Sequence, residues 1–131
     1  QPVFSWLIII CLRSTPFNIT IIQVYTPTSD YDNADMEDFY DQLQDVLDKR
    51  LKKNILVVQG DWNAKIGEDT CMNWKGTYGH CCNTQTNKRG LRLLEFASYK
   101  DIMLANTFGQ HKVSRRWTWH SPSGDHHNQF D

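Results

Sequence analysis

The sequence is short of three features that would place it in a specialised class: a long hydrophobic run, an excess of one charge, and a regular cysteine pattern. The apolar run over residues 4–12 falls well short of the roughly 20 residues that span a bilayer. Fourteen basic and fifteen acidic residues give a formal charge of -1, so no chain-wide basic field attracts nucleic acid. We therefore expect no membrane anchor, and any polyanion would have to be bound locally.

The four cysteines, Cys11, Cys71, Cys81 and Cys82, are irregularly spaced and include an adjacent pair. This spacing suits neither a compact disulfide framework nor a paired C-x-x-C zinc site. A zinc site that also uses His80 is the alternative, but adjacent cysteines point poorly at one tetrahedral centre. The pattern favours reduced thiols and hence an intracellular protein.

The composition is that of a folded globular domain, with 40% hydrophobic and 12% aromatic residues in a chain of 131 residues. A chain of this length can bury a hydrophobic core, so we expect a single core. The β-branched runs over 3–12 and 18–25, separated by the turn sequence STPF, predict a hairpin. Apolar residues at three- and four-residue spacing from Met36 to Leu51 predict an amphipathic helix.

The remaining segments complete an alternation of strands and helices. Residues 55–59, ILVVQ, form a continuous apolar run and predict a strand buried on both faces. Residues 64–87 have no clear period and predict a long surface loop. A second helix is expected over 88–100, and short strands over 102–107 and 115–121. This order predicts an α/β fold with helices packed on a mixed sheet.

The strand predicted over 55–59 leads directly into Gly60, Asp61, Trp62 and Asn63. A strand that ends in glycine and aspartate fixes a carboxylate at the rim of a sheet, and glycine allows a tight turn or a close approach. Asn63 is expected to project in a similar direction if the extended conformation continues. Asp61 can then accept a proton from water or hold Mg²⁺, and Asn63 can donate to an oxyanion. The alternative is an Asx turn that closes the strand.

Five short motifs occur in the order found in one known superfamily. GDWNA (60–64) resembles the G-D-[FW]-N-A signature of the endonuclease/exonuclease/phosphatase superfamily. The segments QVYTPTSD (23–30), TNKRGLRLLEFA (86–97), LANTF (104–108) and RRWTWHSPSGDHHNQFD (115–131) resemble its other motifs. Together they are most similar to the apurinic-endonuclease-like domain of non-long-terminal-repeat retrotransposons.

The resemblance implies that residues 1–131 are part of one such domain, a four-layered α/β sandwich of two mixed sheets flanked by helices. It implies a nuclear, retrotransposon-derived endonuclease that hydrolyses DNA phosphodiesters with Mg²⁺ or Mn²⁺ near Asp61 and Asn63. By this resemblance Asp61 activates the attacking water, Asn63 stabilises the transition state or positions Asp61, and Tyr25 approaches the scissile phosphate. Thr118 lines the site and Asp131 orients a catalytic histidine.

The chain also departs from the pattern of the superfamily. The metal-binding glutamate is expected upstream of Gln1, and the closing aspartate and histidine are expected downstream of Asp131. We therefore expect a fragment of a longer reading frame that lacks its N- and C-terminal strands and is inactive or weakly active alone. The rival hypothesis is a non-catalytic interaction or scaffold domain with a vestigial nuclease fold.

Two further patterns have two interpretations each. Trp117 and Trp119 share one face of a predicted strand, where they form either a stacking edge for a nucleic-acid strand or part of the core. Asn87, Arg89 and Gly90 open the second helix, where they either meet a phosphate or cap the helix. The sequence leaves both alternatives open for Asn87, and it favours core packing for Trp119.

Overall fold

The computed structural model describes residues 6–28, 30–50, 52–67, 74, 76–77, 79 and 85–108, and the backbone of 119–120 and 127–128. The chain divides into two compact units, residues 1–62 and 63–131, and each is described by itself. Within these described ranges, no helix has the length and apolar character needed to cross a bilayer.

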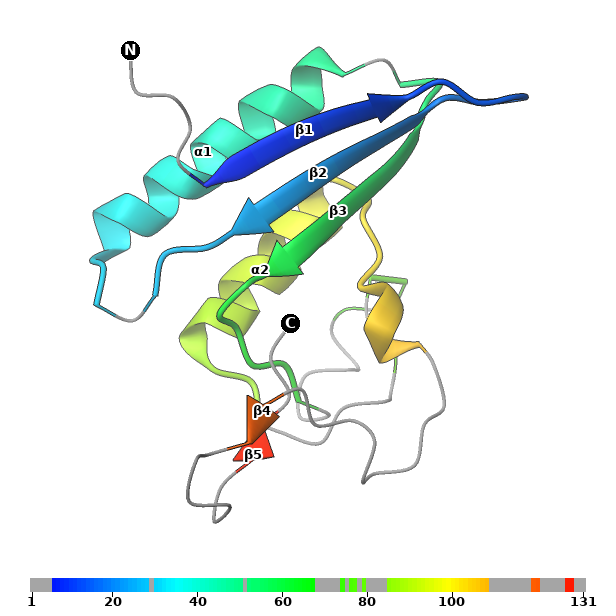
Figure 1. Ribbon diagram of the computed structural model, residues 1–131. Helices are drawn as coiled ribbons and strands as arrows, with labels where there is room; N and C mark the ends of the chain where they lie inside the picture. The colour runs from blue at the N-terminus through cyan, green and yellow to red at the C-terminus, as the bar shows by residue number, and fades with distance from the viewer. Residues whose placement is uncertain are drawn as a thin grey trace. The chain divides into compact units, whose positions relative to one another are not determined.

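The first unit consists of a three-stranded mixed sheet and one helix (Figure 1). β1 (Leu7–Leu12) pairs antiparallel with β2 (Ile19–Tyr25), and β2 pairs in parallel with β3 (Ile55–Asp61). α1 (Asn33–Lys49) connects β2 to β3, as a parallel connection requires. The predicted hairpin, the mixed sheet and the first helix are therefore confirmed.

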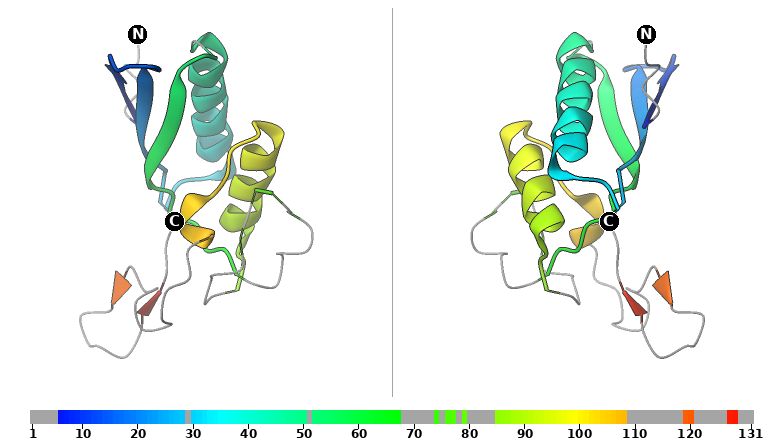
Figure 2. Two further views of the ribbon diagram at one scale, coloured as in Figure 1. Left: turned by 90° about the vertical axis from the view of Figure 1, so that its right-hand side faces the viewer. Right: turned by 90° about the vertical axis from the view of Figure 1, so that its left-hand side faces the viewer.

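Residues directly before and after α1 determine where the helix begins and ends. The Asp32 carboxylate accepts a hydrogen bond from the Asp35 backbone N–H at 2.9 Å and so caps the helix, and the extended backbone of Arg50 ends it. α1 lies beside one face of the sheet, as Figure 2 shows, and it buries one apolar stripe. The buried residues of this stripe are Met36, Phe39, Tyr40, Leu43 and Leu47. Ile22 and Val24 of β2 are also buried.

The other face of the sheet is apolar and exposed in the first unit. On this uncovered face lie Ile8 (63% exposed), Ile10 (48%), Leu12 (45%), Ile55 (50%) and Val57 (39%). The prediction that β3 is buried on both faces is therefore wrong for this chain. The physical reason is that α1 covers only one face, and no described residue of the unit covers the other. Monomeric proteins rarely expose a contiguous apolar surface of this kind.

The second unit is built around α2 (Lys88–Tyr99), which confirms the second predicted helix. Its buried residues include Leu93, Leu94 and Phe96. Instead of the strand predicted over 102–107, the chain forms a 3₁₀ turn, η2 (Ala105–Thr107). The N–H groups of Ile102 and Leu104 donate to the carbonyls of Ala97 and Thr77. These groups are therefore not available to form a ladder with a neighbouring strand. The short strands β4 (Trp119–His120) and β5 (His127–Asn128) pair antiparallel.

Asn87 closes the start of α2 and ties it to residues 64–67. Its side-chain oxygen accepts from the N–H groups of Gly90 at 2.8 Å and Lys65 at 3.2 Å, and its own N–H donates to the Lys65 carbonyl at 3.0 Å. The capping interpretation of Asn87 is therefore confirmed. Gly90 permits this close contact, because an added Cβ would lie 2.0 Å from the Lys65 carbonyl oxygen.

We predict that Asn87→Ala lowers the free energy of unfolding by about 1 to 2 kcal/mol, because two backbone N–H groups lose their acceptor. Asn87→Asp keeps an acceptor oxygen and is the matched control, expected to cost less. Urea unfolding followed by circular dichroism measures both. Equal stability of the alanine variant and the parent chain would contradict the role of this cap.

Candidate functional site at the carboxyl edge of the sheet

The carboxyl ends of the two parallel strands bring Tyr25 and Asp61 together. β2 and β3 pair in register, so Tyr25 lies opposite Asp61 at the last position of each strand. Parallel register partners share one face of a sheet, so the phenol and the carboxylate are neighbours. Both side chains are exposed, Tyr25 by 51%. Two of the predicted site residues are thus placed side by side by the backbone.

Gly60 is required by a close approach between the two strands. Its φ is +144°, and an added Cβ would lie 1.8 Å from the Val24 carbonyl oxygen of β2. No side chain fits there, because the obstacle is the backbone of the neighbouring strand. The close approach of β2 and β3 therefore requires a glycine at the position directly before Asp61.

The backbone of Asp61 is held by Thr26, the residue that follows β2. The Thr26 N–H and hydroxyl both donate to the Asp61 carbonyl oxygen, at 2.9 Å and 3.2 Å. Thr26 itself is completely buried. The carboxylate of Asp61 thus extends from a rigid support, as a catalytic group requires.

Trp6 stacks on Tyr25 and in turn contacts Tyr31, and neither Trp6 nor Tyr31 was predicted from the sequence. The Trp6 ring stacks on Tyr25 with centroids 6.4 Å apart and planes 14° apart, and Tyr31 meets Trp6 edge-on at 5.4 Å. The Tyr25 N–H also donates to the Trp6 carbonyl at 3.0 Å. Trp6 could have been predicted from the hairpin register, because Trp6 comes directly before Leu7, which pairs with Val24. Tyr31 has no such signal, since it follows a turn.

The extended conformation does not continue to Asn63, so the expectation that Asn63 projects like Asp61 is wrong. β3 ends at Asp61, and Asn63 has a φ of 45°, a left-handed conformation that asparagine tolerates better than most residues. Trp62, between them, turns its ring edge-on to Phe39 of α1 at 6.2 Å. The alternation of side chains along a strand does not extend to Asn63, because the chain turns immediately after β3.

The described residues contain no group of three or more histidine, cysteine, aspartate or glutamate side chains placed to hold a metal ion. Asp61 supplies one carboxylate at the edge. Mg²⁺ is often bound through one or two carboxylates, with waters and substrate phosphates completing its octahedron. Asp61 therefore fits as one ligand of such an ion, but the described residues do not make up a complete site.

Several predicted residues lie outside the described residues. These are Thr118 and Asp131 of the candidate site, Trp117, and the cluster Cys71, His80, Cys81 and Cys82. Cys11 is described and is a free, exposed thiol. The roles predicted for the residues outside the described ranges stay predictions.

The first unit is of the mixed α/β class, with a three-stranded mixed sheet whose two parallel strands end in the exposed side chains of Tyr25 and Asp61. The chain is homologous to Craniofacial development protein 2. It is 36% identical over 119 residues to that protein from Bos taurus and 35% identical over 119 residues to that from Tragulus javanicus. These residues make up 91% of this chain but span 20% of each relative. No family model matches the chain, and no solved structure matches it.

Proposed function

We propose that this chain forms part of a metal-dependent phosphodiester hydrolase of the endonuclease/exonuclease/phosphatase type, which nicks DNA. The observation that carries the proposal is the register of Tyr25 with Asp61 at the carboxyl edge of two parallel strands. A rigidly supported carboxylate beside a phenol supplies a proton acceptor and a hydrogen-bond donor at one place. Hydrolysis of a phosphodiester needs both, one for the water and one for the phosphate oxygens.

The uncovered face of the sheet supports the four-layered sandwich proposed for the whole domain. Its exposed isoleucine, leucine and valine side chains lie on one face of the three strands, opposite α1, and the hydrogen-bonded pair Gln23 and Gln59 lies on the same face. Burial of apolar surface stabilises a protein by about 25 cal/mol per Å². A second sheet packed on this face would give a sheet-on-sheet core flanked by α1, which is the sandwich arrangement.

In the proposed reaction, Asp61 accepts a proton from the attacking water as the water oxygen bonds to phosphorus. The bond from phosphorus to the leaving sugar oxygen breaks, and this oxygen takes a proton from solvent. The Tyr25 hydroxyl donates a hydrogen bond to a non-bridging phosphate oxygen. Mg²⁺ or Mn²⁺, when bound, would neutralise phosphate charge, with Asp61 as one ligand. The Trp6 ring stacked on Tyr25 restricts the phenol and offers an aromatic surface to a sugar or base. A DNA substrate, a retrotransposon origin and a nuclear location are part of the same proposal, and the order of the five motifs supports them.

We predict that the full-length protein containing this chain nicks supercoiled plasmid in the presence of Mg²⁺ and that Asp61→Asn slows nicking by about 10² to 10⁴-fold. The substitution removes the charge and keeps the shape. Removal of Mg²⁺ with EDTA is expected to stop the reaction in the parent protein. The 131-residue chain assayed in parallel is expected to show little or no nicking.

Asp45→Asn is the matched control, because Asp45 is an exposed carboxylate of α1 that lies outside the candidate site. It is expected to leave the nicking rate unchanged. If Asp61→Asn nicks DNA as fast as the parent protein, Asp61 has no role in the reaction. A folded full-length protein that binds DNA and never nicks it would instead support a non-catalytic interaction domain.

A further inference from the structure

Three aromatic side chains, Trp6, Tyr25 and Tyr31, form one cluster beside Asp61 in the first unit. The Trp6 ring is nearly parallel to that of Tyr25, with planes 14° apart, and it meets the Tyr31 ring edge-on, with planes 88° apart. Tyr25 is 51% exposed, Tyr31 is 44% exposed, and Trp6 is partly exposed. Tyrosine and tryptophan are enriched at binding surfaces because they offer a large, rigid apolar area with a polar tip. The cluster therefore has the composition and the exposure of a ligand-binding surface.

The backbone places this cluster in line with the candidate catalytic carboxylate. Tyr25 is the register partner of Asp61, and its N–H donates to the Trp6 carbonyl at 3.0 Å, which extends the β1–β2 pairing to Trp6. Trp6, Tyr25 and Asp61 therefore form a row across the three strands, on the face opposite α1. Neighbouring strands are about 4.8 Å apart, so the row spans about 10 Å. A substrate held at Asp61 has the aromatic rings directly beside it.

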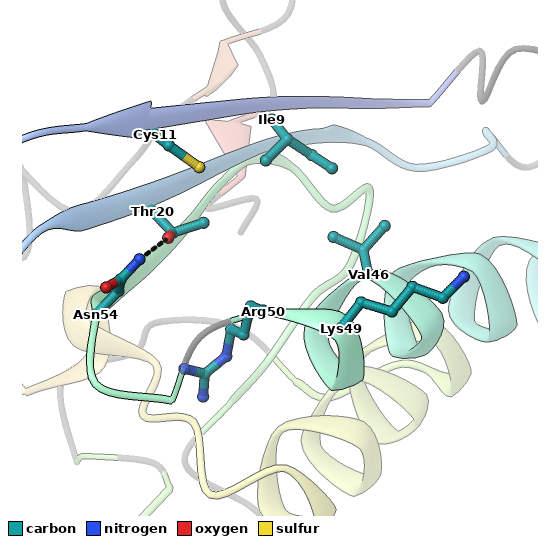
Figure 3. A pocket seen from close by; sticks show the side chains of 7 residues that line it. All are labelled: Ile9, Cys11, Thr20, Val46, Lys49, Arg50 and Asn54. Carbon is teal, nitrogen blue, oxygen red and sulfur yellow. Dashed lines mark hydrogen bonds between the residues drawn. The ribbon is translucent and has the colours of Figure 1, made fainter.

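The basic residues of the first unit lie away from this row. They follow β1 or lie between the last turn of α1 and β3, toward the opposite end of the sheet: Arg13, Lys49, Arg50, Lys52 and Lys53. Figure 3 shows Lys49 and Arg50 at the C-terminal end of α1, where they line one pocket with Cys11 and Thr20. Within the first unit, affinity for a nucleotide at the carboxyl edge must therefore come from the aromatic rings rather than from pairing with phosphates.

We propose that Trp6, Tyr25 and Tyr31 bind a nucleobase next to the phosphate that is cleaved, and that Trp6 determines specificity for it; this inference rests on the proposed hydrolase function. Every base has a flat π face that stacks on an aromatic ring, whatever the sequence. A deoxyribose offers such a ring no comparable flat surface. A base reaches exposed rings only when it is unpaired or turned out of its stack. The substrate class is therefore DNA with a single-stranded or distorted position beside the cleaved bond.

The test is a titration of the isotopically labelled chain with two oligomers in EDTA, followed by the NMR signals of its indole and amide groups. One oligomer is hexathymidylate, and the other has the same sugar–phosphate backbone with every base replaced by hydrogen. We expect saturable shifts of the Trp6 indole with hexathymidylate. Its affinity is expected to be at least about fivefold higher than that of the base-free oligomer, because stacking of one base contributes about 5- to 150-fold.

Trp6→Ala is expected to remove this difference in affinity, and Trp6→Phe is expected to keep part of it, because phenylalanine keeps a smaller ring. Phe17→Ala is the matched control. It removes a ring that is 56% exposed in the turn between β1 and β2, at the opposite end of the sheet, and it should leave both affinities unchanged. If Trp6→Ala does not fold, the comparison of the two oligomers on the parent chain still decides.

Equal affinity of the parent chain for the two oligomers would overturn the inference. A difference that survives in Trp6→Ala, or the absence of a saturable shift at the Trp6 indole, would also overturn it. The outcome is independent of the nicking assay. Base-dependent affinity in a protein that never nicks DNA would contradict the hydrolase and support the base site, whereas nicking without base-dependent affinity would support the hydrolase and overturn the base site.

Discussion

Gly60→Ala is expected to destabilise the chain by about 3 kcal/mol or more, a large part of the total stability of a typical domain. The added Cβ would lie 1.8 Å from the Val24 carbonyl oxygen and within 3 Å of two more backbone atoms of Val24. Relief would require the ends of β2 and β3 to move apart, since no flexible side chain is involved. The φ of +144° adds strain for any residue with a Cβ. Urea unfolding measured by circular dichroism provides the value.

Gly76→Ala separates the steric effect from the conformational one. Gly76 also has a positive φ, of 86°, but nothing lies within 4 Å of the position that its Cβ would take. We expect this control to cost about 1 to 2 kcal/mol, from backbone strain alone. If the two variants were equally stable, the close contact between Gly60 and Val24 would be absent in solution. The same result would remove the structural reason for a glycine before Asp61.

Phe39→Ala is the second substitution with a large expected effect, a loss of about 3 to 5 kcal/mol in the free energy of unfolding. Phe39 is completely buried on the stripe of α1 that covers the sheet. Its ring meets Tyr40 edge-on at 5.2 Å and Trp62 at 6.2 Å. The substitution therefore leaves a cavity and also removes the contact that anchors the turn after Asp61. Denaturant unfolding followed by tryptophan fluorescence reports both effects.

Phe17→Ala is the same chemical change at a position where the side chain is 56% exposed. Surface substitutions of this kind usually change stability by less than about 0.5 kcal/mol. A similar loss in both variants would mean that α1 does not pack on the sheet through Phe39. The difference between them measures how much burial of the Phe39 ring stabilises the first unit.

Local chemistry made parts of the fold predictable. The spacing of apolar residues determines α1 and α2, because a helix must bury one stripe whatever it packs against. The β-branched runs on either side of a turn determine the β1–β2 hairpin, since their pairing is between neighbours in the chain. Asp32 and Asn87 begin their helices by bonds to residues three positions away.

Other features depended on contacts that no local pattern specifies. Residues 102–107 read as a strand, but their N–H groups bond to Ala97, Leu104 and Thr77 rather than to a neighbouring strand. The apolar run of β3 reads as buried on both faces, but burial depends on which layers are present. Asn63 reads as a neighbour of Asp61, but the turn after the strand gives it a left-handed backbone.

The candidate site shows the same division. The sequence by itself determined that a carboxylate follows a strand at Gly60 and Asp61, because strand propensity and the glycine act over a few residues. Only the tertiary structure decided that Tyr25, 36 residues earlier in the chain, stands opposite that carboxylate, with Trp6 stacked upon it. Pairing register between distant strands is set by the packing of α1 and by the contact of Gly60 with Val24, and these exist only once the chain has folded.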